Sequence, residues 1–181
     1  IIDTFDMPTE YGSPIYKGNQ TRNDAACVAM GREAGGVLMG KTVTTEFANR
    51  HPGKTCHPMD ASRTPGGSSS GSAAAVADCQ VHLAIGTQTT ASTLRPASFC
   101  GIYSLKPTTG LVSIRGIIPC SASLDHCGPM ARTVEDVALM LGPLAGYDNL
   151  DIFSVESTPK DYLQEMRQPV SGFRLGTPQS F

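Results

Sequence analysis

Residues 65–96 constrain the fold most, because glycine, serine and alanine dominate the stretch PGGSSSGSAAAVADCQVHLAIGTQTTASTLRP. The small side chains over 70–78 predict a helix that packs closely against its neighbours. Glycine and serine at this density are typical of places where backbone amides come close to a reacting group. Both flanking turns carry serines that can act as nucleophiles, and neither has an evident histidine partner. Catalysis at such a site therefore requires a different base.

The composition predicts a globular chain with neither a nucleic-acid partner nor a membrane partner. Its 181 residues can bury a sizeable core, which predicts a single domain over 1–181. Charged residues make up only 17% of the chain, so much of it is expected to be buried. The net charge of −2, without a basic run, argues against a nucleic-acid partner. No apolar run reaches the length of a membrane span, and we expect a cytoplasmic protein without a membrane partner.

Both ends of the sequence resemble internal points of a longer chain. The sequence begins Ile1-Ile2-Asp3 without an initiator methionine, and it ends at Phe181 just after the strand-like residues 173–176. We therefore expect the natural chain to extend beyond both ends.

The cysteines and histidines do not predict a metal centre. Cys27, Cys79 and Cys100 stand among small or apolar residues, which is typical of buried, reduced thiols in a cytoplasmic protein. His51, Cys56 and His57 cluster in a loop that contains proline and glycine but no second ligand pair. We expect an ordinary solvated loop there and no bound metal.

Alternating helical and extended patterns predict an α/β fold. Helices are expected over about 24–34, 70–78, 133–144 and 158–167, and buried strands over 37–39, 83–85 and 102–105. Asn23 is the expected N-cap of the first helix, and Thr133 with Asp136 forms the expected capping box of the third. Residues 107–132 are expected to hold turns and short extended pieces.

Two short motifs match patterns from other protein classes. Residues 35–42 fit the phosphate-binding pattern G-x4-G-K-T, but they follow a predicted helix rather than a strand. Residues 67–71 fit the G-x-S-x-G elbow of esterases, but the preceding residues 60–65 are not an apolar strand. A triad there would need His82 or His126, for which structural or solvated roles are commoner. Nucleotide binding and esterase chemistry are therefore the weaker alternatives.

The two serine clusters together resemble the amidase signature family, whose hallmark is a GGSSSGS stretch followed by GTxTGGS. The corresponding segments here are GGSSSGS at 66–72 and GTQTTAS at 86–92. Similarity covers nearly the whole chain in the order of the family, including MPTEYGSPIY, DAACVAMGREAGGVLMGKT, CGIYSLKPTTG and SLDHCGPMARTVEDVALML. The resemblance implies an α/β/α sandwich with a mixed central sheet, of which this segment holds only a part.

The resemblance also implies a Ser–Ser–Lys triad. Ser92 corresponds to the acylating serine, and Ser68 corresponds to the bridging serine, which in the family commonly follows a cis peptide. The family's lysine belongs to a Lys-Asp pair directly ahead of the Ile1-Ile2-Asp3 stretch, so the lysine would lie two residues before Ile1, outside this sequence. A buried lysine with a lowered pKa can act as a base, and the hydroxyl of Ser68 can both donate and accept the proton that it relays. Lys41 corresponds to a different position of the family.

Backbone N–H groups of Thr89, Thr90, Ala91 and Ser92 are the implied oxyanion hole. The family's glycine pair is replaced here by Thr90-Ala91. The amide donors survive this change, although a positive φ would be strained at the β-branched Thr90. Both serine-rich turns could also serve close packing alone.

Two neighbours of the nucleophile differ from many family members. Gln88 stands where many have aspartate, and Arg95 follows the nucleophile by three residues rather than two. This version resembles the malonamidase-like branch and favours Arg95 as a clamp for a substrate carboxylate, since its forked donors fit one. The alternative is a structural guanidinium.

The function implied by the resemblance is hydrolysis of a carboxamide C–N bond through a Ser92 acyl-enzyme, without metal or cofactor. The expected partner is a small-molecule amide, and a homodimer is left open. One alternative is the glutaminase of a tRNA-dependent amidotransferase. Another is a catalytically impaired pseudoenzyme or fragment, given the missing lysine and the altered glycine pair.

Overall fold

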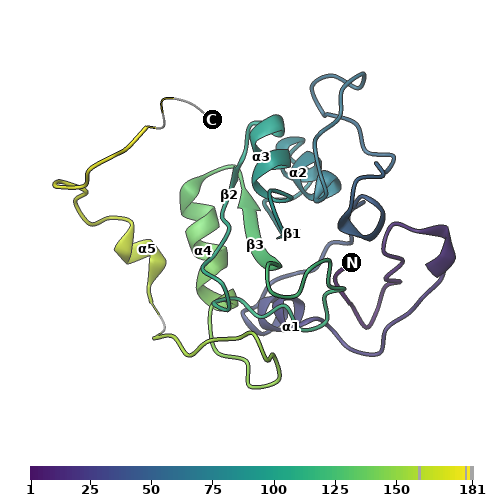
Figure 1. Ribbon diagram of the computed structural model, residues 1–181, viewed down its shortest axis with the longest axis horizontal. Helices are drawn as coiled ribbons and strands as arrows, with labels where there is room; N and C mark the ends of the chain where they lie inside the picture. Colours follow the sequence, from purple (N-terminus) through teal and green to yellow (C-terminus); the bar gives the residue numbers. More distant parts are fainter. Residues whose placement is uncertain (159, 178, 180–181) are drawn as a thin grey trace.

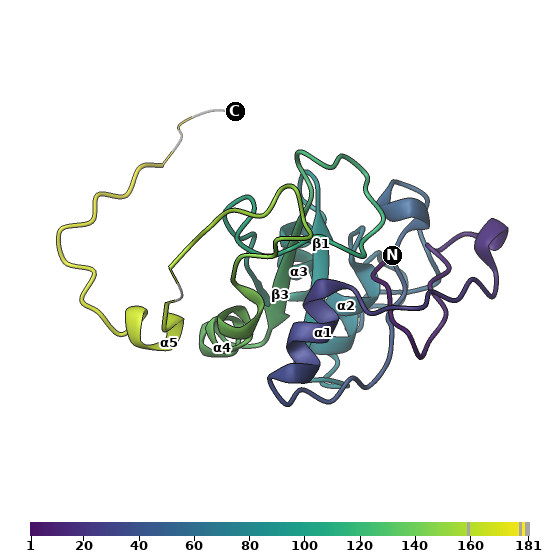
Figure 2. The same ribbon diagram turned by 90° about the horizontal axis from the view of Figure 1, so that it is seen from below.

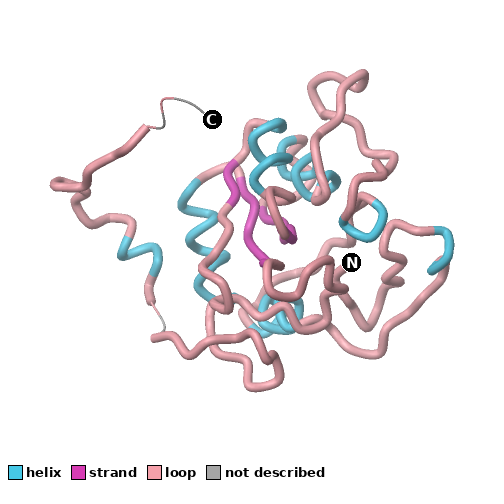
Figure 3. Tube along the Cα trace, viewed as in Figure 1, coloured by secondary structure: helices cyan, strands magenta, loops and turns pink. Residues whose placement is uncertain are grey.

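The computed structural model describes residues 1–158, 160–177 and 179 of the chain. Its helices are α1 (Ala26–Glu33), α2 (Ser70–Ala77), α3 (Leu94–Cys100), α4 (Val134–Leu144) and α5 (Tyr162–Glu165), with 3-10 turns η1 (Pro14–Tyr16) and η2 (Glu46–Ala48). The strands are β1 (Leu83–Gln88), β2 (Tyr103–Ser104) and β3 (His126–Ala131). They lie at the centre of the molecule, surrounded by helices and long loops (Figures 1 and 3).

The described strands form one sheet in the order β1-β3-β2, and both pairings are antiparallel. Gln88 at the end of β1 pairs with His126 at the start of β3. The segments expected at 83–85 and 102–105 are therefore strands, the first longer and the second shorter than predicted. The central strand β3 was expected to be turns and short extended pieces, because Gly128 and Pro129 are residues typical of turns.

Helices cover both faces of the sheet, which confirms the α/β/α arrangement (Figures 1 and 2). On one face α2 and α3 pack through small side chains against Met130, which is fully buried. On the other face α1 and α4 pack around Cys127 and Leu144. Residues of β3 thus face opposite layers, as the pleat of a strand requires.

The first helix begins at Ala26, so the predicted N-cap at Asn23 is wrong. Carbonyls from other segments satisfy its first amides, since Ala25 N donates to Asp3 O at 2.9 Å and Ala26 N donates to Arg115 O at 3.0 Å. A side-chain cap is not required when tertiary contacts supply the acceptors. The expected cap of α4 is confirmed, because the side chain of Thr133 accepts a hydrogen bond from Asp136 N.

Other local predictions differ from the structure. The predicted strand at 37–39 is an extended loop in which Val37 is 82% exposed, so its short apolar run does not join the sheet. Cys79 is exposed, whereas Cys27 and Cys100 are buried as predicted. The helix predicted over 158–167 is the shorter α5, which Asp161 caps by accepting from Gln164 N at 3.0 Å. Pro159 lies outside the described residues.

The described chain beyond α5 lies outside the sandwich in both ribbon views (Figures 1 and 2). Among the residues that the structure describes, no helix has the length and apolarity that crossing a bilayer requires.

Replacement of Gly128 by alanine tests the packing of the central strand. A Cβ added at Gly128 would lie 2.1 Å from the backbone oxygen of Leu105. Because the clash is with the backbone, rotation of a side chain cannot relieve it. We expect Gly128→Ala to lower the free energy of unfolding by about 1–3 kcal/mol or more, measured by urea denaturation. Gly142→Ala is the matched control, since an added Cβ there has nothing within 4 Å and alanine favours helix. Equal stability of Gly128→Ala and the unsubstituted protein would contradict this packing.

Candidate active site

The two serine clusters that are distant in the sequence lie side by side. Ser69 N donates to Ser92 O at 3.1 Å. The hydroxyl of Ser69 donates to Thr87 O and accepts from Thr87 N, both at 3.1 Å. Gly86 permits this approach, because an added Cβ would lie 3.0 Å from Ser69 Oγ and 2.8 Å from Thr93 Cγ2. The structure therefore brings Ser68 and Ser92 to the same end of β1.

The backbone of Ser68 is hydrogen-bonded, whereas its hydroxyl has no partner in the part of the chain that the structure describes. Its carbonyl accepts hydrogen bonds from Thr45 N at 3.1 Å and from Thr44 Oγ1 at 3.2 Å. The residue is only 1% exposed, yet Ser68 Oγ has no hydrogen-bond partner within the described residues. The peptide bond between Gly67 and Ser68 is cis. A buried hydroxyl without a partner is uncommon and points to a functional role.

The turn after β1 presents several backbone amides together. Among the described residues, no intramolecular acceptor is found for the N–H groups of Thr89, Thr90, Ala91 and Ser92. None of these residues has a positive φ, so threonine and alanine fit this turn without left-handed strain. Free amides on one tight turn can stabilise a developing oxyanion.

The side chain of Gln88 holds the end of this turn at Thr93 and Leu94. Its side chain is buried, and Oε1 accepts from Thr93 N at 3.1 Å, from Thr93 Oγ1 at 2.8 Å and from Leu94 N at 3.1 Å. The side-chain oxygen thereby caps the first amides of α3 and fixes the path of the chain beyond Ser92. The acceptor in this role is the neutral amide oxygen of a glutamine.

Arg95 reaches back to the other serine cluster. Its Nε donates to Gly67 O at 3.0 Å, and one terminal nitrogen donates to the same oxygen at 2.6 Å. The residue as a whole is exposed. Two donors are thus engaged by the backbone just before Ser68, while the guanidinium retains further N–H groups.

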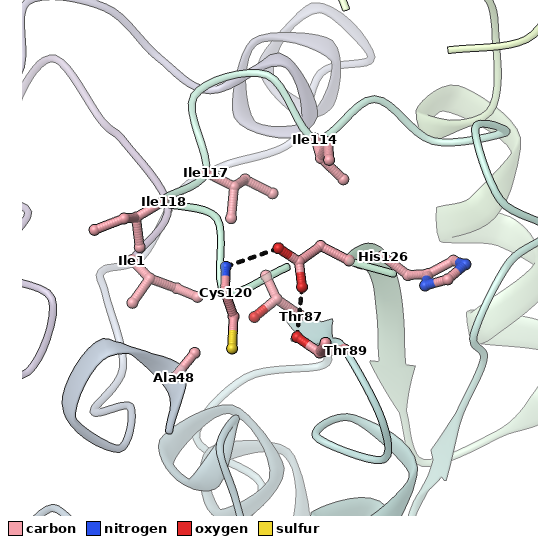
Figure 4. A pocket seen from close by; sticks show the side chains of 10 residues that line it. Ile1, Ala48, Thr87, Thr89, Ile114, Ile117, Ile118, Cys120 and His126 are labelled. Atoms are coloured by element: carbon pink, nitrogen blue, oxygen red, sulfur yellow. Dashed lines mark hydrogen bonds between the residues drawn. The ribbon is translucent and has the colours of Figure 1, made fainter. Parts of the chain in front are cut away.

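A carboxylate joins the start of the turn to the loop before β3. Asp125 accepts a hydrogen bond from Thr89 Oγ1 through one oxygen. Its other oxygen accepts from Cys120 N at 2.8 Å and from Ser121 N at 2.9 Å. Figure 4 shows the bonds that reach Thr89 and Cys120. Asp125 was not among the residues expected at the site, although it lies within the segment SLDHCGPMARTVEDVALML.

A small pocket lies beside these bonds, and Ile1, Thr87, Thr89 and Cys120 are among its lining residues (Figure 4). Its free space of about 10 Å³ is close to the smallest cavity that holds one water molecule, so it is too small for an amide substrate. The lining residues show instead that the chain at Ile1 lies next to the end of β1 that leads to Ser92.

Lys41 makes its hydrogen bond away from the two serine clusters. Its Nζ donates to Thr9 Oγ1 at 2.5 Å. Burial lowers the pKa of Lys41, and the neighbouring carboxylates of Asp3, Asp6 and Glu10 oppose that shift. Residues 36–45 form an extended loop that is followed by a 3-10 turn, so Lys41 does not precede a phosphate-binding helix. The match to G-x4-G-K-T is therefore coincidental.

Two of the candidate histidines, His126 and His57, have structural hydrogen-bond partners. His126 Nδ1 lies 2.7 Å from Leu124 O, and its Nε2 lies 3.0 Å from Thr109 Oγ1 and 3.2 Å from Lys106 Nζ. His82 is exposed just before β1. In the predicted loop, His57 Nε2 lies 2.9 Å from Phe99 O, and its Nδ1 accepts from Met59 N at 3.2 Å. Neither the esterase triad nor the metal interpretation gains support from this geometry.

Comparison with known proteins agrees with the resemblance. The sequence model of the family described as Amidase matches residues 1–181. A glutamyl-tRNA(Gln) amidotransferase subunit from Anaeromyxobacter sp. (strain K) is 44% identical over 187 residues, which cover 100% of this chain and 38% of that protein.

Solved structures agree as well. The native peptide amidase of Stenotrophomonas maltophilia superposes with a TM-score of 0.85 at 39% identity, over 91% of this chain and 37% of that one. A glutamyl-tRNA(Gln) amidotransferase subunit from Thermotoga maritima superposes with a TM-score of 0.82 at 39% identity, over 87% of this chain and 36% of that one. The chain thus spans less than half of the length of these relatives. It belongs to the amidase signature family.

Proposed function

We propose that this chain carries the two catalytic serines of an amidase that hydrolyses a carboxamide C–N bond through an acyl-enzyme on Ser92. The observation that carries the proposal is the state of the Ser68 hydroxyl. This hydroxyl is buried beside the Ser92 turn and has no hydrogen-bond partner among the described residues. A relay hydroxyl needs free donor and acceptor capacity toward both a nucleophile and a base. The other serines of the cluster do not have this capacity, since Ser69, Ser70 and Ser72 donate to backbone carbonyls.

In the proposed reaction, Ser92 Oγ attacks the amide carbonyl carbon and passes its proton to Ser68 Oγ. The proton of Ser68 moves to a neutral lysine, which lies upstream of Ile1 in the family pattern. The N–H groups of Thr89, Thr90, Ala91 and Ser92 stabilise the tetrahedral oxyanion. The relay then protonates the leaving amine, and water hydrolyses the acyl ester along the same route in reverse.

The position of Ile1 supports the upstream base. Ile1 lines the same pocket as Thr87 and Thr89, and its carbonyl accepts from Ile118 N at 3.1 Å. A lysine two residues before it would therefore enter the molecule near the serines. Its entry beside apolar isoleucines favours a neutral amine, because desolvation disfavours the ammonium form. The substrate is a small-molecule amide, and neither a metal nor an organic cofactor is part of the proposal.

A second candidate function is the glutaminase of a tRNA-dependent amidotransferase. Its support is the 44% identity to a glutamyl-tRNA(Gln) amidotransferase subunit. The same two serines would then release ammonia from glutamine. Ammonia release from free glutamine that requires partner subunits would favour this candidate, whereas hydrolysis of simple amides by the isolated protein would favour the amidase.

Labelling with an alkyl fluorophosphonate tests the roles of the serines in the full-length protein. We expect the adduct on Ser92, no adduct in Ser92→Ala, and labelling of Ser68→Ala slowed by about a hundredfold or more because the proton relay is lost. Mass spectrometry of peptides locates the adduct.

Ser70→Ala is the matched control for this experiment. Ser70 Oγ donates to Val43 O, which also accepts from Gly71 N at 2.8 Å, so the substitution strands no carbonyl. The control should label at the rate of the unsubstituted protein. A folded, lysine-containing protein that is not labelled on Ser92 would instead indicate a pseudoenzyme.

We also propose that the remaining donors of Arg95 bind a substrate carboxylate. Arg95→Ala should lower kcat/KM about tenfold more for an amide that carries a terminal carboxylate than for its neutral analogue, because hydrogen bonds between charged groups contribute about 1.5–3 kcal/mol. Steady-state kinetics on the matched pair of amides measures the difference. Equal losses for both amides would assign Arg95 to the support of Gly67 alone.

A further inference from the structure

We propose that Asp125 is a positioning residue that fixes the amides of the oxyanion turn by holding Thr89. The inference rests on the proposed function, but it concerns a residue outside both serine clusters. It predicts that a carboxylate which touches neither the nucleophile nor the relay controls the rate of acylation.

The place of Asp125 in the fold is the first support for this role. Gln88 and His126 are the last register pair between β1 and β3. Thr89 follows the end of β1 and Asp125 precedes the start of β3, so the pairing of the two strands brings these residues opposite each other. The backbone pairing ends there, and the bond from Thr89 Oγ1 to the carboxylate continues the connection by one more step.

The second support is how firmly the carboxylate is held. Its other oxygen accepts from Cys120 N and Ser121 N at 2.8 and 2.9 Å. Ser121 O in turn accepts from Leu124 N and Asp125 N, both at 2.8 Å, which closes the loop into a compact turn. Asp125 is thus fixed from two sides before it contacts Thr89. Charge-assisted hydrogen bonds of this kind are stronger than neutral ones.

The third support is the position of Thr89, directly before the amides of the oxyanion turn. The amides of Thr90, Ala91 and Ser92, unpaired within the described part of the chain, follow it directly, and the side chain of Gln88 fixes the far end of the turn. With both ends held, the direction of the three amides is set before a substrate arrives. Displacement of catalytic groups by about 1 Å can cost a hundredfold in rate, so loss of one anchor should appear in the chemical step.

The test uses an alkyl fluorophosphonate on the full-length protein, with the maximal rate of inactivation measured separately from the inhibitor concentration at half-maximal rate. Thr89→Val and Asp125→Asn should each lower the maximal rate about tenfold or more and change the half-maximal concentration less than about twofold. Thr89→Ser keeps the hydroxyl and should lose less than Thr89→Val. The double variant should lose no more than either single variant, because both remove the same contact.

Asp148→Asn is the matched control, since Asp148 also accepts several hydrogen bonds, from Ser113, Arg115 and Leu150, at a place away from the serines. It should lower the melting temperature without a selective loss of inactivation rate. A normal rate in folded Thr89→Val, or an equal loss in Asp148→Asn, would overturn the positioning role. No labelling of Ser92 in the unsubstituted protein would overturn the proposed function as well, which separates the two failures.

Discussion

The site depends on the hydroxyls of Ser69 and Ser72, which fasten α2 to the free edge of β1. Ser69 Oγ bonds both backbone groups of Thr87, and Ser72 Oγ donates to Ile85 O at 2.9 Å. Alternate residues of a strand present their polar groups to the same edge, so these hydroxyls occupy the positions that a neighbouring strand would use. This attachment places Ser68 beside the turn that carries Ser92. The small side chains of α2 make the close approach sterically feasible.

The serines of this cluster differ in the hydrogen bonds that their hydroxyls make. The hydroxyls of Ser69, Ser70 and Ser72 are engaged by the backbone, whereas that of Ser68 is buried without a partner among the described residues. This division is the reason why we assign the proposed proton relay to Ser68 alone among the serines of the cluster. Within the described residues, the N–H groups of the opposite turn have no acceptor, and the side chains of Asp125 and Gln88 contact its two ends.

The approach of the two serine clusters to each other could be predicted from the sequence, because they lie in two short segments with distinctive glycine and serine content. The catalytic roles of Ser68 and Ser92 stay a prediction. The covering helices α2 and α4 were also predictable, the second from the cap at Thr133. Strand β3 was not, because Gly128 and Pro129 suit a turn locally, and the close approach of Leu105 that requires Gly128 arises only in the folded sheet. The contact between Asp125 and Thr89 was equally hidden, since it depends on strand register, and register is a property of the folded sheet rather than of any one segment.

In the proposed mechanism, Ser92 forms the acyl-enzyme and Ser68 only relays its proton. Rapid quenching of the full-length protein during turnover of an activated acyl substrate, followed by peptide mass spectrometry, tests it most directly. We expect a transient acyl ester on Ser92, with Ser68 unmodified. An acyl group on Ser68, on another serine of the cluster or on Cys120 would contradict it.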